Sequence, residues 1–414
     1  MKRIVLVLIA VSLLTARTMT LNDCISEAEK NNLDIKISDK DLRSTELNLK
    51  GAGNRFWDVS GSGSYTLDGD DDDNLYSNLS ASAGVSGTVS PFLFHNYSYA
   101  KISANSTALN HSEILNSVRY KVINSFFQTL LAEENLKLQA EICEYSSKKF
   151  EEAQLKFNMG NISRSDLLSF EVSKSSDQID LKAAESNLKK NKQNLIYYMN
   201  SDMITDSLNL SFTLNDDTEN TEFKETDLLS EAVENRPDMK MMKNSLDQSE
   251  LSLKMQYDNY LPSLTGSVIY DYSKMKDINN NVDYPATDGI SARLGLSVNL
   301  TYSGLNGIDK EKVEVTKSRL QLDSRTESVK NEIRLKLIEL DNQKNNLELA
   351  KKHVELAQEN LDLADKLFFI GNKSATDYLQ ARNDYIQARY REISYQYNLI
   401  IVKYDLYNSL GRKL

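Results

Sequence analysis

A short segment that occurs twice constrains the fold of this chain more than any other feature of the sequence. Residues 156–168 and 367–379 share the pattern Gly-Asn-x-Ser-x-x-Asp, which begins at Gly160 and at Gly371. In each copy the glycine ends an apolar helical pattern, the serine follows three residues later, and the aspartate falls in the first turn of the next helix. These residues are typical of a position where one helix ends and another begins a few residues later. Each copy is therefore expected to form the tip of a long helical hairpin.

The chain on either side of each tip contains few helix-breaking residues. No proline occurs between Pro91 and Pro237 or after Pro285, so residues 98–157 and 308–368 can each form one unbroken helix. At 1.5 Å per residue, each of these helices would extend about 90 Å. Helices of this length indicate an elongated molecule, because a compact globular domain does not need them.

Apolar residues in the second of these runs recur at spacings of four and three residues, which is typical of a coiled-coil seam. A second apolar series, spaced by seven residues, would let the helix pack against a second neighbouring helix on its other side. Helices that pack on both sides in this way can form the wall of a tube. The first series consists of Ile333, Leu337, Leu340, Leu347, Ala350, Val354, Ala357, Leu361, Ala364 and Phe368. The second series consists of Leu349, Leu356, Leu363 and Ile370.

The repetition extends beyond the tips to a whole half of the chain. Residues 27–36 align with residues 231–240, and the motif Leu-x-Leu-Lys occurs at residues 47–50 and again at 251–254. A chain of 414 residues would ordinarily divide into separate domains. An internal duplication indicates one elongated, pseudo-symmetric unit instead.

In each half, two segments alternate small or polar residues with apolar ones. These segments are Val59–Leu67 and Leu79–Val89 in the first half, and Leu264–Tyr272 and Ile290–Leu300 in the second. Alternation over about ten residues is typical of transmembrane barrel strands, which place one face against lipid and the other against water. Four strands cannot close a barrel, so subunits are expected to pool their strands. Two chains would supply eight strands and three would supply twelve, and the residues alone leave both open.

The N-terminus indicates export. Two basic residues precede the apolar run Ile4–Leu14, which has the length of the hydrophobic region of a signal peptide and is too short to span a bilayer. We therefore expect residues 1–16 to be a signal peptide. Ala16 is a suitable residue before the cleaved bond, but Leu14 is larger than the residue usually found there, so the cleavage site stays open. No later stretch is apolar over about 18 residues, so membrane insertion would require β-strands.

Composition and motifs argue against catalysis. The net charge of −11, with no dominant basic patch, argues against a nucleic-acid partner. No phosphate-binding loop, nucleophile elbow, catalytic carboxylate pair or metal-ligand spacing occurs in the sequence. The acidic run Asp70–Asp73 is interpreted as a solvated loop between two strands. We therefore predict a protein that is not an enzyme and has no catalytic residue, cofactor or metal.

Three motifs carry a resemblance to a known family. Both tips read Phe-x-x-Gly-x-x-Ser-x-x-Asp, residues 235–238 read Asn-Arg-Pro-Asp, and residues 260–264 read Tyr-Leu-Pro-Ser-Leu. With these motifs the chain resembles the TolC-like family of outer-membrane efflux and secretion channels, over nearly all of its length after the signal peptide. The resemblance implies a mainly α fold with a membrane β-barrel. In that fold a homotrimer with four β-strands per protomer forms a twelve-stranded barrel, and long coiled-coil helical hairpins form a twelve-helix periplasmic tunnel.

The resemblance also implies a function and partners. Such channels passively conduct drugs, small toxic molecules or secreted proteins as the outer-membrane component of a tripartite efflux or type I secretion system. The expected partners are a periplasmic adaptor protein, an inner-membrane pump of the RND, ABC or MFS type, and outer-membrane lipid. The tip residues expected to dock the adaptor are Gly160, Asn161, Ser163, Gly371, Asn372 and Ser374.

The duplication divides the chain into two structural repeats, each with a helix, a strand pair and a long hairpin. The first is expected at residues 21–200, with strands at 59–89, and the second at residues 228–411, with strands at 264–300. Residues 201–227 fit the short equatorial linker element that joins the two halves in the family.

In some relatives, links between helices near the tips hold the tunnel mouth shut, and acidic residues line it. The matching gate positions are Asp166 and Lys373, with Asp377 one turn further on. Phe368 stands where a hydrogen-bonding tyrosine helps to close some relatives, and Gln380 stands where they have a second acidic residue. The alternative interpretation is that both aspartates only stabilise the starts of their helices, which is worth about 0.3–1 kcal/mol each, and that the lysine is solvated.

A second class of protein also has long helical hairpins. A periplasmic coiled-coil adaptor, or a structural coiled-coil protein, is the alternative to a channel. Neither would need strand pairs at duplicated positions, and no lipoyl-like β module of the kind found in adaptors occurs in the sequence.

Overall fold

The computed structural model describes residues 17–69, 75–212, 224–298 and 303–414. The predicted signal peptide, the acidic run Asp70–Asp73, most of the second half of the predicted linker and the last two residues of the fourth predicted strand lie outside the described residues.

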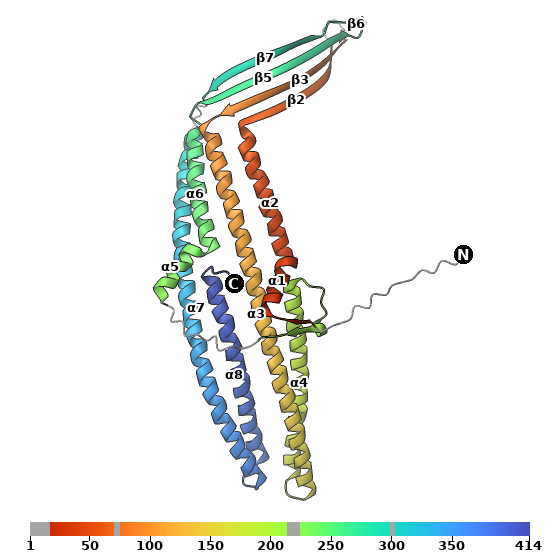
Figure 1. Cartoon of the computed structure of the whole chain (residues 1–414), viewed down its shortest axis with the longest axis vertical. Coiled ribbons are helices and arrows are strands. Elements are labelled where there is room, and N and C mark those ends of the chain that lie inside the picture. Colours follow the sequence, from red (N-terminus) through yellow and green to blue (C-terminus); the bar gives the residue numbers. More distant parts are fainter. Residues whose placement is uncertain (1–16, 70–74, 213–223, 299–302) are drawn as a thin grey trace, which may run out of the picture. The chain divides into compact units, whose positions relative to one another are not determined.

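The main elements form two series in the same order (Figure 1). The first series is α1 (Leu21–Asn31), α2 (Leu33–Gly53), β2 (Trp57–Gly69), β3 (Leu75–Val89), α3 (Pro91–Asn158) and α4 (Arg164–Met199). The second series is α5 (Glu225–Asn235), α6 (Pro237–Asp258), β5 (Ser263–Asp277), β7 (Thr287–Ser297), α7 (Ser303–Phe369) and α8 (Ala375–Ser409). Corresponding helices have nearly equal lengths, 68 and 67 residues for α3 and α7, and 36 and 35 residues for α4 and α8.

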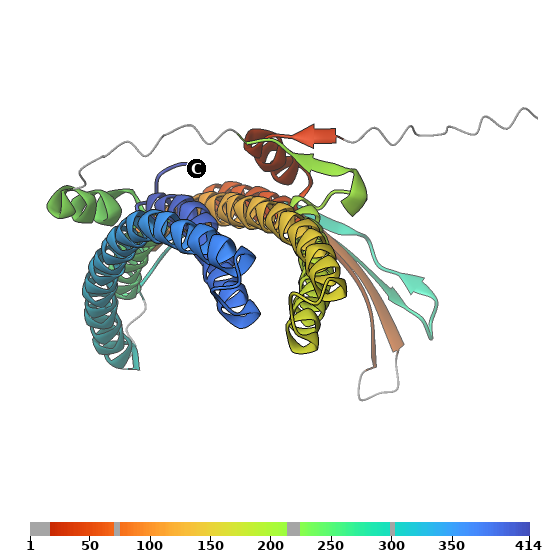
Figure 2. The ribbon, with the colours of Figure 1, turned by 90° about the horizontal axis from the view of Figure 1, so that it is seen from below.

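The fold is mainly helical, as the sequence predicted. Pro91 begins α3, where its missing N–H costs no hydrogen bond, and no proline interrupts α3 or α7 afterwards. α3 with α4, and α7 with α8, form two helical hairpins; Figure 2 views them from below. None of the helices in the described parts of the chain is long and apolar enough to cross a membrane.

One predicted helix is divided into two. The sequence predicted a single helix at the start of the first repeat, but the chain leaves the helix at Asn32, where ψ is 132°. The Asn32 carboxamide oxygen accepts a hydrogen bond of 2.9 Å from the backbone N–H of Asp34, which helps α2 to begin. The second repeat has the same break at Arg236, where ψ is 130° and a proline starts the next helix. The first repeat has Leu33 at the position of this proline, so its sequence did not reveal the break.

The chain divides into two compact units. The first contains the described residues up to 37, residues 113–236 and residues 328–414, and the second contains residues 38–112 and 237–327. The hairpin tips belong to the first unit and the strands β2, β3, β5 and β7 belong to the second.

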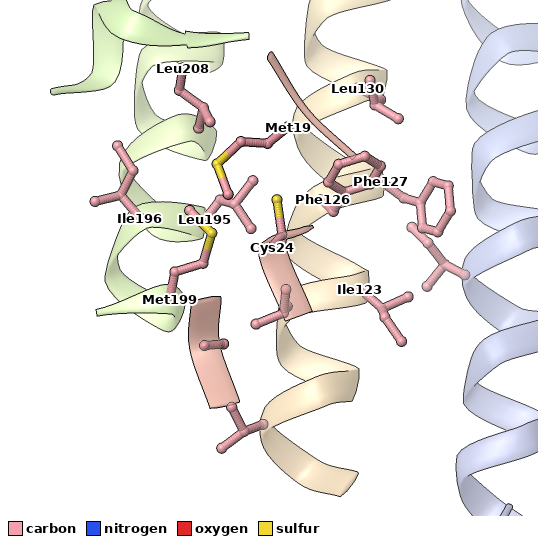
Figure 3. Close-up of a cluster of buried hydrophobic side chains, with 14 of the residues drawn as sticks. Met19, Cys24, Ile123, Phe126, Phe127, Leu130, Leu195, Ile196, Met199 and Leu208 are labelled. Carbon is pink, nitrogen blue, oxygen red and sulfur yellow. The ribbon is translucent and has the colours of Figure 1, made fainter. Parts of the chain in front are cut away.

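A short strand near the start of the described chain completes the core of the first unit (Figure 3). β1 (Arg17–Met19) pairs in parallel with β4 (Leu208–Leu210), which lies in the predicted linker between the repeats. Met19 and Leu208 are fully buried in a cluster that includes Phe126 of α3. β1 could not be predicted from the sequence, because three residues are too few to show an alternating pattern.

The second unit contains an antiparallel sheet with the strand order β2-β3-β5-β7. Val85 of β3 lies between Val59 of β2 and Val268 of β5, and Val268 lies opposite Ala292 of β7. β6 (Val282–Asp283) adds a short bridge at the end of β5. Among the described strands, β2 and β7 each pair along one side only, so the sheet has two open edges.

Candidate functional site

The two hairpin tips have the same backbone conformation. Gly160 and Gly371 have φ angles of +78° and +80°, in the left-handed region that favours glycine. At the first tip the N–H of Asn161 donates to the carbonyl of Lys156 at 2.9 Å, and the N–H of Gly160 donates to the carbonyl of Phe157 at 2.9 Å. Equivalent bonds form at the second tip. Both helices therefore end in a Schellman motif, which satisfies carbonyls that the helix leaves unpaired.

The next helix at each tip begins with a capping box. The hydroxyl of Ser163 accepts a hydrogen bond of 3.1 Å from the N–H of Asp166, and the aspartate accepts one of 3.2 Å from the N–H of Ser163. Ser374 and Asp377 form the same pair of bonds at 3.1 and 3.4 Å. Both predicted gate aspartates therefore take part in helix capping. The side chain of Asp377 is nevertheless exposed and that of Asp166 is half-buried, so capping leaves both charges at least partly accessible to solvent.

The capping contacts change the acidity of one gate candidate. Hydrogen bonds from the hydroxyl and then the N–H of Ser374, with a smaller contribution from the charge of Lys373, lower the pKa of Asp377. Within the described residues of one chain, no ion pair joins Lys373 to Asp166. The acid–base link expected at the gate, and the tip residues expected to dock an adaptor, stay predictions.

Apolar side chains are exposed beside both glycines. Met159 precedes Gly160, and Ile370 precedes Gly371, and both side chains are exposed together with that of Phe369. From the sequence, Ile370 was assigned to an apolar seam, whereas Met159 and Phe369 were not singled out. Met159 and Ile370 stand at equivalent positions, each directly before the glycine of its tip, and this repetition in the sequence could have identified them as a pair.

The two departures from the family pattern have definite surroundings. Phe368 packs against Phe170 and Tyr378, with ring centroids 5.4 and 5.7 Å away. Gln380 donates a hydrogen bond of 2.9 Å to Asp384 on the next turn of α8. The aromatic ring at position 368 therefore belongs to a core between the hairpins and has no hydroxyl to offer a gate.

The two apolar series of α7 differ in burial. Ile333, Leu340 and Ala364 of the first series are buried in the chain. Every member of the second series is exposed, with side-chain exposures of 66, 57, 52 and 64% for Leu349, Leu356, Leu363 and Ile370, respectively. We call these four residues the α7 stripe. One chain therefore covers only one of the two seams that the sequence predicts.

The sheet has two chemically different faces. The register places aliphatic and aromatic side chains on one face and hydroxyl-bearing side chains on the other. The apolar face includes Val59, Tyr65, Leu67, Leu79, Val85, Leu264, Val268, Ile290, Leu294 and Leu296, and all of these side chains are exposed. The polar face includes Ser60, Ser62, Ser64, Ser80, Ser82, Ser86, Ser267 and Ser291.

Serine hydroxyls on the polar face bind one another across strands. Ser62 and Ser82 lie 2.8 Å apart, and Ser64 and Ser80 lie 2.7 Å apart, measured between their Oγ atoms. Paired hydroxyls form a polar surface with small side chains. This face therefore suits contact with water, whereas the apolar face suits contact with hydrocarbon.

Solved structures of several outer-membrane proteins have this succession of helices and strands. The Campylobacter jejuni CmeC outer membrane channel has a TM-score of 0.78 at 18% identity, over 94% of this chain and 85% of that chain. The outer membrane protein VceC of Vibrio cholerae has a TM-score of 0.80 at 13% identity, over 95% and 96%. The open state of the Neisseria gonorrhoeae MtrE channel has a TM-score of 0.78 at 16% identity, over 97% and 93%. At these identities the likeness shows a common fold.

The fold, with its duplicated hairpins and two-faced strand pairs, is that of the TolC-like outer-membrane channels. Residues 228–412 match the model of the family described as outer membrane efflux protein. No curated protein matches the sequence.

Proposed function

We propose that this protein is the outer-membrane component of a tripartite efflux or type I secretion system and that it works as a homotrimer. The main support for this proposal is the sheet, which has an apolar face, a polar face and two open edges. An exposed apolar face is stable against lipid, and open strand edges are unstable there unless another chain pairs with them. Edge β2 of one protomer would therefore pair with edge β7 of the next.

Three copies suit the fold of the channels that this chain resembles. Pooling four strands from each of three protomers gives a barrel of twelve strands, with the serine face toward the water-filled interior. The α7 stripe supports the same assembly, because exposed leucines at heptad spacing favour a neighbouring helix. A ring of protomers would bury this stripe along each seam.

The helical hairpins would form the periplasmic part of the conduit. Their tips expose apolar side chains, which favours docking of a periplasmic adaptor. An inner-membrane pump would supply the energy, and the channel itself would conduct its cargo passively.

Planar-bilayer recording of protein purified from the outer-membrane fraction tests the conduction. We expect stepwise current increases as single trimers insert, and a membrane that stays silent after addition of well-folded protein would contradict the proposal. Affinity purification from crosslinked cell envelopes tests the partners. An adaptor and a pump are expected to copurify with the wild-type protein, and their absence from repeated purifications would contradict the tripartite assignment.

A further inference from the structure

One basic side chain stands on the polar face of the sheet. Within the described strands β2, β3, β5 and β7, the register places a single lysine or arginine on that face, Arg293 of β7. Its side chain is exposed, and Ser267 of β5 lies directly opposite it. Ser291 and Gly295, the nearest residues of β7 on the same face, are also small. The guanidinium of Arg293 therefore has no bulky neighbour along β7 or across from it on β5.

No carboxylate neutralises this arginine within the described residues of one chain, where Arg293 takes part in no ion pair or side-chain hydrogen bond. Asp58 lies in the same row of the sheet, but β3 and β5 separate the two residues, which places them about 14 Å apart. Asp271 lies opposite Gly289, four residues along β7 from Arg293, at about 13 Å. Both separations exceed the screening length of about 8 Å at physiological ionic strength. Arg293 therefore presents an isolated positive charge.

The other charges on the polar face of these strands are acidic. The exposed ones are Asp58, Asp68 and Asp271. Asp277 is buried and accepts hydrogen bonds of 2.9 and 2.8 Å from the backbone N–H and the side-chain amide of Asn280. Carboxylates that line a water-filled interior favour the passage of cations over anions. Arg293 is thus the one charge on this face of the described strands that opposes a preference for cations.

We propose that Arg293 is a charge-selecting residue of the channel interior, which keeps the strand-lined part of the conduit permeable to anions and to cargo with carboxylate, sulfate or phosphate groups. This inference rests on the proposed channel function and concerns the selectivity of the same conduit. Three protomers place three guanidinium groups at one level of the interior. A ring of arginines attracts anions, as a ring of carboxylates attracts cations. Each guanidinium can bind a carboxylate or a phosphate through two parallel hydrogen bonds.

The reversal potential of single channels in a gradient of potassium chloride measures the preference for cations. Arg293→Gln removes the charge and is expected to raise the permeability ratio of potassium to chloride by about twofold or more. Arg293→Lys keeps the charge and should stay close to the wild type. Asp271→Asn removes an acidic charge from the same face and should shift the ratio in the opposite direction.

Lys274→Gln is the matched control. Lys274 lies opposite Leu79, on the apolar face of the sheet, so this variant removes a positive charge from the other side of the same wall. Its permeability ratio should equal that of the wild type. Equal ratios in the wild type and Arg293→Gln would overturn the inference and leave the proposed function standing, because the channels themselves would still form. A wild-type protein that forms no channels would overturn both.

Inorganic triphosphate tests anion binding at the arginine ring. This multivalent anion should reduce the current through wild-type channels, and half-maximal block of Arg293→Gln should need a concentration about fivefold higher or more. A residue needed only for folding would change the number of inserted channels and leave the block of each channel unchanged. An arginine that pairs with an acidic residue across a seam between protomers would leave the wild type as insensitive to triphosphate as Arg293→Gln. Equal sensitivity of these two proteins would therefore overturn the inference.

Discussion

Two glycines determine how the chain reverses at the tips. A Cβ built on Gly160 or Gly371 would meet nothing within 4 Å, so steric clash is not the reason for glycine. The reason is the positive φ angle, which costs an ordinary L-residue about 1 kcal/mol or more. Asparagine tolerates this conformation better, and Asn200 and Asn281 adopt φ angles of 49° and 51° in this chain.

We expect Gly160→Val and Gly371→Val to leave membrane insertion intact and to abolish export, because the strained tip no longer presents the adaptor surface. Gly160→Asn and Gly371→Asn are the matched controls and should export normally. Export assays normalised to the amount of protein in the outer-membrane fraction check this prediction. Normal export by both valine variants at normal amounts would contradict it.

The lowered pKa of Asp377 leads to a pH dependence. A free aspartate has a pKa of about 3.9, and the hydrogen bonds from Ser374 lower the value in the folded protein. The carboxylate therefore stays charged, and its capping contribution is retained, until the pH falls through the lowered pKa. Block of the channel by multivalent cations at the tips should accordingly persist at about pH 4 and disappear only in more acidic solution.

Ser374→Ala removes the hydroxyl that caps α8 and that helps to lower the pKa of Asp377. Cation block of this variant should therefore be lost at a higher pH than in the wild type. Asp377→Asn gives the baseline without this carboxylate, and its block should be weak at every pH. Cation block is measured in planar bilayers as a function of pH for the wild type, Ser374→Ala and Asp377→Asn. Equal midpoints for the wild type and Ser374→Ala would show that this hydrogen bond does not control the block.

The two faces of the sheet predict different effects of the same substitution. Leu294 and Ser291 lie on β7 and face opposite sides of the sheet. Lysine on a lipid-facing side costs about 2–4 kcal/mol near the middle of a bilayer, whereas lysine facing water costs little. Leu294→Lys should therefore reduce folding into the outer membrane much more than Ser291→Lys does. Heat-modifiable migration of the outer-membrane fraction measures folding, and equal yields of the two variants would contradict the assigned faces.

Long elements with a regular pattern could be predicted from the sequence. The hairpins follow from heptad spacing without proline, and the strands follow from an alternation that the register now assigns to two faces. β1 was missed because three residues are too few to show a periodic pattern. The break at Asn32 was missed because it depends on a single side chain that caps a helix. The contact between Arg382 and Asp177 joins residues far apart in the chain, and nothing in either local sequence indicates a partner.

At the scale of the whole molecule, the α7 stripe predicts where protomers meet. Leu356 is near the middle of the stripe and has a 57% exposed side chain in the single chain. Leu356→Glu would place a carboxylate in an apolar seam, which is unfavourable unless it is paired. We expect this variant to lower the fraction of trimer at a given detergent and protein concentration. Lys351→Glu adds a carboxylate to another face of α7 and should leave the trimer fraction unchanged, as measured by analytical ultracentrifugation.

In the proposed assembly, three copies of this chain build one outer-membrane channel. Native mass spectrometry of the protein extracted from the outer membrane measures the number of copies most directly. We expect a complex of three times the mass of the mature protomer, which dissociates to monomers only when the detergent conditions also unfold the strands. A stably folded monomer in the extract, with no trimer at any concentration, would contradict it.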